Sequence, residues 1–375
     1  MIESKIALVC IVVAAIYIIR LFYSKYDFRI LEFIPSIVVV YFLMMSGANL
    51  QIFSPDTVKY FEPAKNYILA SMIFLMLLKS DIKSVYRMKT KLLVSFFAVS
   101  FSIMAGFVVM WAVMGDLFEP DAYKGFGALC GSWIGGTANM IAVASSVGVD
   151  GELMGYCLVT DSVCYGVWLM FLLFLVPYKD IFNRWSKADD TAIESVATVE
   201  SGGIGVDFVS LFSALLLSVF AVYMAGVLPK SSFVGVSFWV VVIATVLGVA
   251  ASATPMSKSV ASEKVAFWLL YLLISLIALG SSFGDFAKAP LFIAAGFLVI
   301  FFHAVFAVLY AKIFRIDLFT IGVASLANIG GVASAPLLAA SFDKNLVSVG
   351  VLMSMLGYII GTFCGIGVTY ILGGI

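Results

Sequence analysis

Twelve long apolar stretches constrain the fold of this chain more than any other feature. A helix needs about 20 apolar residues to cross the hydrocarbon core of a bilayer, and most of the stretches reach or approach that length. They are residues 6–24, 28–50, 66–79, 92–115, 126–148, 152–177, 208–228, 233–251, 265–282, 289–311, 318–341 and 346–372. The pattern predicts an all-α protein that crosses a lipid bilayer many times.

Composition agrees with this class and excludes others. Hydrophobic residues make up 63% of the 375 residues and charged residues only 12%, against about 25% in soluble domains. The formal net charge is zero, so the chain lacks the basic surplus that binds nucleic acid. The chain has a single histidine and five scattered cysteines, none in a CxxC pattern. We therefore expect no cofactor, and a sodium ion is the one candidate for a bound ion.

The first apolar stretch predicts a spanning helix that is not removed. The basic and acidic residues of the first five positions are followed by an apolar run to Ile19, as in a signal peptide. No small-x-small cleavage site follows this run, which ends in Arg20 and three large residues. We expect a multi-pass protein of the cell's inner, cytoplasmic membrane.

A polar stretch and an internal repeat divide the chain into two halves. Residues 178–207 predict a solvated cytoplasmic linker between a first repeat, 1–177, and a second, 208–375. An offset of 195 places Gly135-Gly136 on Gly330-Gly331, and small residues after each pair also coincide. Internal duplication is the interpretation that this match favours.

The distribution of basic residues favours repeats of opposite orientation. If all twelve stretches cross the membrane, the 22 Lys and Arg residues divide evenly between the two sides. If 126–148 and 318–341 instead enter and leave on one face, 16 lie on the linker side and 6 opposite, which agrees with the positive-inside rule. Each half then has five crossings, and the halves are inverted. A broken helix that crosses fully remains the alternative to this re-entrant hairpin.

The two Gly-Gly stretches are the predicted binding site. Paired glycines weaken a helix, and polar groups at membrane depth need partners. Interrupted helices at matching places in two halves are typical of transporter sites, where helix N-termini face anions. Packing glycines are the structural alternative. The expected substrate-binding residues are Ser132, Gly135, Gly136, Asn328, Gly330, Gly331 and Ser334.

Asp161 is the acid nearest the centre of any apolar stretch. A carboxylate at bilayer depth marks an ion or proton pathway by default, although a hydrogen-bonded structural Asp is the alternative. His303 could handle protons or simply bond a facing helix. The expected ion-coupling residues are Thr137, Asn139, Thr160, Asp161, Ser162 and His303, with Asn139 and Asp161 as candidate sodium ligands.

Three blocks carry a resemblance to a known family. They are GSWIGGTANMIAVA at 131–144, ANIGGVASAPLLAA at 327–340 and GVLMSMLGYIIGT at 350–362, and together they resemble the YjcL-like membrane proteins of a domain of unknown function. More distantly, Gly135 to Asn139 is similar to the Gly-Gly-Thr-x-Ser-Asn signature of the bile acid:sodium symporters, whose superfamily includes cation:proton antiporters. Ala138 stands in place of that serine, and the second block has no acid.

The distant resemblance implies a mechanism as well as a fold. It implies a core domain with two crossed discontinuous helices, a panel domain, elevator-like alternating access and, by analogy, a homodimer. It also implies a sodium site at Asn139 and Thr137, completed by residues 160–162.

From these observations we predict a secondary active transporter. It would carry a small organic solute, with an anion as the expected class, by sodium or proton symport. The alternatives are a cation/proton antiporter without an organic substrate and, less favoured, a membrane-embedded enzyme. No catalytic constellation is present, so we expect no enzymatic activity.

Overall fold

The computed structural model describes most of the chain. The described residues are 2–25, 35–78, 90–188, 204–230, 235–280, 288–343 and 346–375. Throughout these ranges the regular structure is helical, apart from one isolated bridge between Ile2 and Phe53. Seven of the described helices are long and apolar enough to cross a membrane, which confirms a multi-pass membrane protein.

Each predicted stretch contains at least one helix. The first half has α1 (Lys5–Lys25), α3 (Ser36–Asn49), α4 (Pro55–Lys59), α5 (Glu62–Leu77), α7 (Thr90–Met114), η1 (Gly115–Leu117), α8 (Ala122–Gly135), α9 (Thr137–Val147) and α10 (Gly151–Leu175). After η2 (Val176–Tyr178) and α11 (Lys179–Ser186), the second half has α12 (Ile204–Val227), α13 (Val236–Ser252), η3 (Pro255–Lys258), α14 (Ala261–Leu279), α15 (Ala289–Phe314), α16 (Leu318–Ile329), α17 (Gly331–Phe342) and α18 (Val347–Gly373).

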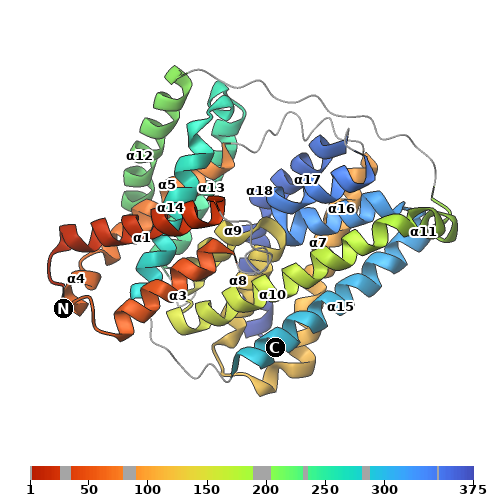
Figure 1. Cartoon of the computed structure of the whole chain (residues 1–375), viewed down its shortest axis with the longest axis horizontal. Helices are drawn as coiled ribbons and strands as arrows, with labels where there is room; N and C mark the ends of the chain where they lie inside the picture. Colours follow the sequence, from red (N-terminus) through yellow and green to blue (C-terminus); the bar gives the residue numbers. More distant parts are fainter. Residues whose placement is uncertain are drawn as a thin grey trace.

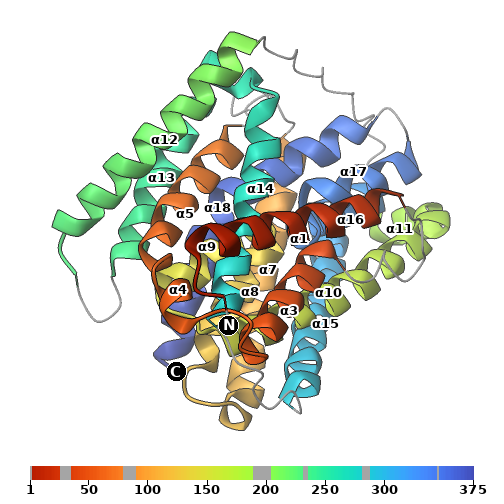
Figure 2. The ribbon, with the colours of Figure 1, turned by 60° about the vertical axis from the view of Figure 1, so that its left-hand side comes forward.

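The helices form two bundles, and both halves contribute to each in the same order. Helices α1, α3 and α5 pack with α12, α13 and α14 in what we call the side bundle. Helices α7 to α10 pack with α15 to α18 in the central bundle, on the right of Figure 1. The bundles meet chiefly where α9 contacts α13 and α5, so α9 lies at their boundary (Figure 2).

The expected linker is more structured than its polarity suggests. It begins with η2 and α11, and α12 already starts at Ile204 rather than at 208. Asn183 of α11 accepts a hydrogen bond from the N–H of Leu318, at 2.8 Å, and Lys312 donates to the carbonyl of Trp185. These contacts anchor α11 on the central bundle. Residues 189–203, like most of the basic cluster at 79–91, lie outside the described residues.

Each Gly-Gly stretch is broken into two helices that fold back on one another. A Cβ atom on Gly131 of α8 would lie 2.8 Å from Val143 of α9, and one on Gly322 of α16 would lie 3.7 Å from Leu338 of α17. The breaks fall where Gly136 and Gly331 have φ angles of +84° and +61°. This region of backbone conformation is costly for any residue that carries a Cβ atom. We call the α8–α9 pair hairpin 1 and the α16–α17 pair hairpin 2.

The bases of the two hairpins lie at opposite ends of α7. At the start of α7, Lys91 forms an ion pair of 3.1 Å with Asp317, the residue before α16. At its other end, Trp111 packs against Tyr123, in the first turn of α8. A helix of 25 residues is about 37 Å long, longer than a hydrocarbon core. The hairpins therefore approach each other from opposite ends of the central bundle.

Small residues allow hairpin 1 to lie directly against α18. Added Cβ atoms on Gly361 and Gly365 would come within 2.8 and 2.7 Å of backbone atoms of Gly135 and Gly127. In lipid, apolar burial gives little drive for helix association, so close backbone packing of this kind holds helices together. The ridge of Gly357, Gly361 and Gly365 thus positions the tip of hairpin 1.

Candidate functional site

The two hairpin tips are partly exposed within a buried surrounding. Gly136 and Thr137 at the first tip, and Gly330 and Val332 at the second, are partly accessible, whereas Gly135 and Ile329 are buried. Neither α9 nor α17 has a side-chain cap at its N-terminus. The first N–H groups of both helices therefore point toward the tips without a capping side chain, which favours an anion there.

Asp161 of α10 lies against the last turn of α8. Its Oδ1 accepts hydrogen bonds from Trp133 Nε1, at 2.9 Å, and from Ser132 Oγ, at 3.2 Å. An indole N–H can only donate, so this oxygen acts as an acceptor. Oδ2 receives no hydrogen bond from the residues that the structure describes, and the side chain is partly exposed. One carboxylate oxygen is thus held in place, while the other has no hydrogen-bond partner among the described residues.

Helix α10 links the two tips. Tyr165 lies one turn after Asp161, and a Cβ atom on Gly330 would lie 2.8 Å from its ring. Four residues of helix rise about 6 Å. The neighbourhoods of the two tips are therefore about one helical turn apart along α10, and the structure brings together the two halves of the predicted site.

Oxygen atoms suited to a hard cation are present around these tips. Pro336 lies inside α17, and because proline has no N–H, the carbonyl of Val332 loses its helical donor. That carbonyl joins the carboxylate of Asp161 and the hydroxyls of Ser132 and Thr137 as candidate ligands. All four are hard oxygen donors, the type that binds alkali and alkaline-earth ions.

Asn139 closes the first tip. Its Nδ2 donates to the carbonyl of Gly135 at 2.6 Å, which satisfies the end of α8, and its Oδ1 accepts from Thr362 of α18 at 2.5 Å. The side chain is buried. Both polar atoms are therefore engaged within the protein, although Oδ1 keeps a second lone pair for a cation.

Three further predicted residues face different neighbours. The methyl group of Thr160 packs at Gly296 of α15, and its buried hydroxyl has no described partner. Ser162 donates to the carbonyl of Leu158 in its own helix, at 2.8 Å. Ser334 of α17 lies directly beside Gly330 at the second tip.

His303 and Asn328 belong to two separate sets of buried hydrogen bonds. The ring of His303 bonds Ser102 at 2.6 Å through Nδ1 and Ser325 at 2.8 Å through Nε2, and Ser325 also accepts from Trp168. Asn328 accepts from Ser100 at 2.7 Å. The bonds around His303 tie α7, α10, α15 and α16 together, and the bond of Asn328 adds a second link between α7 and α16. No described hydrogen bond joins His303 to Asp161.

Several polar partners could not be selected from the sequence. Trp133 lies in the Gly-Gly block, but nothing in its apolar type marks it as the donor to Asp161. Ser102 and Ser325 resemble the many serines that bond their own helices, and they only become a chain when α7 and α16 pack.

Comparison with known proteins identifies a family but assigns no activity, substrate or site residue. Residues 8–374 match the family model described as "Protein of unknown function (DUF819)". The chain is also similar to a Bacillus subtilis (strain 168) protein named "Uncharacterized membrane protein YjcL", with 23% identity over 331 residues that cover 81% of this chain and 82% of that protein.

Proposed function

The chain belongs to the DUF819 family of membrane proteins, and we propose that it is a secondary active transporter of a small organic solute. The observation that supports this most is the pair of broken hairpins, whose partly exposed tips lie one turn apart along α10 beside Asp161. Such tips present uncapped N–H groups to a solute at membrane depth, and the carbonyl of Val332 lacks its helical donor.

The arrangement favours inverted repeats. If each hairpin is re-entrant, each half crosses the membrane five times, and an odd number reverses the second half. The bases of the hairpins at opposite ends of α7, marked by Lys91 with Asp317 and by Trp111 with Tyr123, support this topology. The solute would then reach the tips alternately from the two faces.

The two bundles suggest how alternation occurs. We assign the side bundle as the panel and the central bundle as the core that moves against it. The small residues Ala138, Ala142 and Ser145 form the face of α9 toward the panel, and such a face can slide with little steric hindrance. Movement of the core would carry both tips together, as in elevator-like transport.

Asp161 is the proposed coupling residue. A sodium ion would be bound by its free carboxylate oxygen and the neighbouring hydroxyl and carbonyl oxygens, whereas a proton would bind the carboxylate itself. Either ion removes a negative charge from membrane depth, which lowers the cost of moving the core. An anionic solute at the N-termini of α9 and α17 would then be accompanied by the cation.

The test begins with the purified protein in detergent. Thermal-shift screening of solute classes, with sodium, potassium and varied pH, should identify a solute whose stabilisation depends on one cation. Uptake of that solute into proteoliposomes should then require the gradient of that cation. We expect Asp161→Asn to reduce gradient-driven uptake by about tenfold or more, because the amide cannot carry the charge that the ion neutralises.

The melting temperature of Asp161→Asn in the absence of solute is the control for folding, since Asn can still accept from Trp133 and Ser132. Normal gradient-driven uptake by a folded Asp161→Asn variant would remove Asp161 from coupling. If no solute is taken up but a pH gradient drives sodium movement, the cation/proton antiporter is the correct function.

A further inference from the structure

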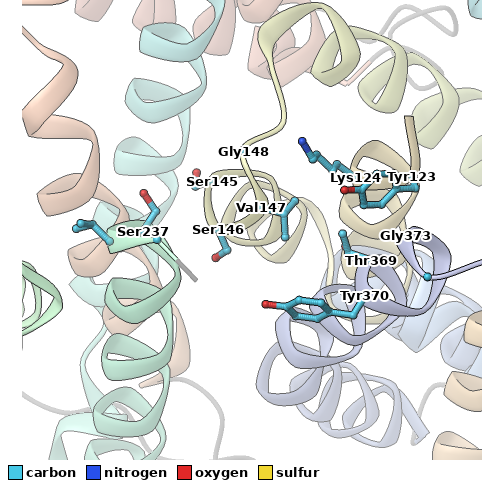
Figure 3. Close-up of a pocket in the computed structure, with 13 residues that line it drawn as sticks. Tyr123, Lys124, Ser145, Ser146, Val147, Gly148, Ser237, Thr369, Tyr370 and Gly373 are labelled. Atoms are coloured by element: carbon cyan, nitrogen blue, oxygen red, sulfur yellow. The ribbon is translucent and has the colours of Figure 1, made fainter. Parts of the chain in front are cut away.

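A wide vestibule opens at the boundary between the bundles. Its volume is about 530 Å³, and Figure 3 shows Ser237 of α13 on one side, Tyr123, Lys124 and Tyr370 on the other, and the end of α9 between them. A second hollow of about 380 Å³ adjoins it and shares Ser145, Gly148 and Ser237. The vestibule therefore lies at the base of hairpin 1, where α9 ends.

A much smaller cavity lies deeper along the same boundary. It measures about 20 Å³ and lies between Ile73 of α5, Thr245 of α13, Asn139 and Ala142 of α9, and Thr362 of α18. Tyr358 also lines it, and it adjoins the tip of hairpin 1 through Ala138. No charged side chain is among the described residues that line it.

Two helix faces lead from the vestibule to this cavity. On α13, Ser237 lines the vestibule and Thr245 the cavity, two turns apart on one face with buried Val241 between them. On α9, Ser145 lines the vestibule and Ala142 the cavity. The barrier between the two spaces is therefore about two turns long on α13, where it includes Val241, and about one turn long on α9.

Thr245 marks the cavity as a site for a polar group. Its side chain is buried, and its hydroxyl has no hydrogen-bond partner among the described residues. Most threonines in helices bond the preceding turn, and an unpaired buried hydroxyl costs about 1–3 kcal/mol. A cavity of this size exceeds the 10–15 Å³ or so that one water needs, and it offers several polar partners.

We propose that Thr245 of the side bundle, together with Asn139 and Thr362 of the central bundle, forms a binding site for an uncharged hydrogen-bonding group. Such a group is a hydroxyl, a carbonyl or an amide, and one water molecule takes its place when the barrier is closed. The assignment of this group to the transported solute rests on the proposed function. The geometry of the site does not depend on it.

The site gives the panel a part in recognition. Asn139 and Thr362 move with the core, whereas Thr245 stays with the side bundle, so the group would be held from both sides only while the tip of hairpin 1 stands opposite Thr245. The charged part of a solute would remain at the hairpin tips near Asp161, and its neutral part would face α13.

Cysteine labelling tests the site without a known solute. The parent carries Cys10→Ser and Cys364→Ala, because Cys10 is exposed and Cys364 partly buried, and it retains the three buried cysteines. Ser145→Cys, Thr245→Cys and Val246→Cys are added separately. Each is treated in proteoliposomes with water-soluble methanethiosulfonates that carry either a trimethylammonium or a sulfonate group.

Val246 is the matched control, because it is the next residue of α13 but is 56% exposed. We expect Ser145→Cys to react fastest and Thr245→Cys at least about tenfold faster than Val246→Cys, since only a hydrated thiol ionises to the reactive thiolate. Relative to Ser145→Cys, the cationic and anionic reagents should react with Thr245→Cys at similar rates.

Reaction of Thr245→Cys no faster than Val246→Cys would overturn the site, as would failure of Ser145→Cys to react. A strong preference of Thr245→Cys for the cationic reagent would overturn its uncharged character, because it would place the cavity in contact with the carboxylate of Asp161. Labelling as expected in a protein that transports nothing would instead refute the proposed function and leave the site standing.

Discussion

At the residue scale, the second glycine of each pair determines where the chain turns. Gly136 and Gly331 are related by the offset of 195 and both have positive φ, whereas Gly330 has a φ of −110°. Beyond Gly331 there is open space, since a Cβ atom there would meet nothing within 4 Å. Its requirement for glycine is therefore conformational and not steric.

Replacement of Gly331 by alanine should distinguish strain from function. A left-handed backbone costs an L-residue about 1–2 kcal/mol, so we expect Gly331→Ala to lower the melting temperature modestly. Gly148→Ala is the matched control, because Gly148 also has a positive φ, of +75°, and open space around it. Both should lose similar stability, measured by thermal unfolding in detergent.

Transport should separate the two variants. Gly331 forms the tip of hairpin 2, so Gly331→Ala should also reduce gradient-driven uptake beyond its effect on stability, whereas Gly148→Ala, in the wall of the vestibule and away from both tips, should reduce it less. Equal uptake by both variants would show that the conformation of the second tip has no part in transport.

The sequence predicted the broken segments that form the candidate site better than it predicted the contacts around them. The Gly-Gly repeat and Asp161 are visible because they are wrong for a lipid-facing helix. The role of His303 is not visible, since its bonds to Ser102 and Ser325 come from two other helices, α7 and α16. Periodicity indicates which face of a helix is apolar, but it does not show which other helix that face contacts.

At the element scale, the hairpins depend on α18 as their support. Gly361 of α18 faces the backbone of Gly135, where an added Cβ atom would come within 2.8 Å of both N and Cα. A backbone atom cannot rotate away as a side chain can. The tip of hairpin 1 is therefore fixed by main-chain contact with the helix that follows hairpin 2.

Gly361→Ala should consequently destabilise the protein. Overpacking of this kind costs about 1–3 kcal/mol, so we expect a lower melting temperature and a shift of the tip away from α18. Gly367→Ala is the control on the same helix, because nothing lies within 4 Å of a Cβ atom there. That variant should melt at the same temperature or higher, since alanine favours the helix by up to about 1 kcal/mol.

A similar melting temperature for the two glycine variants would mean that α8 and α18 do not pack as closely as described. Loss of binding in a thermal-shift assay by Gly361→Ala alone, with the fold retained, would place the packing contact in the mechanism as well as in stability.

At the scale of the whole molecule, the two topologies that the sequence left open differ in whether each half has an odd or an even number of membrane crossings. If both hairpins are re-entrant, five crossings separate the N-terminus from α11, and five more separate α11 from the C-terminus. Lys187 and Ile375 then lie on opposite faces of the membrane. If both Gly-Gly segments cross, each interval contains six crossings, and the two residues lie on the same face.

Labelling of two cysteines from one face of the membrane shows directly whether the number of crossings between them is odd or even. Lys187 and Ile375 are both exposed in the structure, so Lys187→Cys and Ile375→Cys, in the parent that lacks Cys10 and Cys364, should react without disturbing the fold. We expect a membrane-impermeant maleimide to label Ile375→Cys in intact cells and Lys187→Cys only after the membrane is opened. The positive-inside rule gives the direction, because 16 of the 22 basic residues lie on the side of α11 in this topology.

Labelling of both cysteines from one face would remove the inverted repeat, and with it the argument that the two tips approach the membrane centre from opposite sides. Labelling from opposite faces has a further consequence. The vestibule lies beside the C-terminal end of α18, at Thr369 and Gly373, so it would open outside the cell. The structure would then be the outward-facing state, and the barrier between the vestibule and Thr245 would be the outer gate.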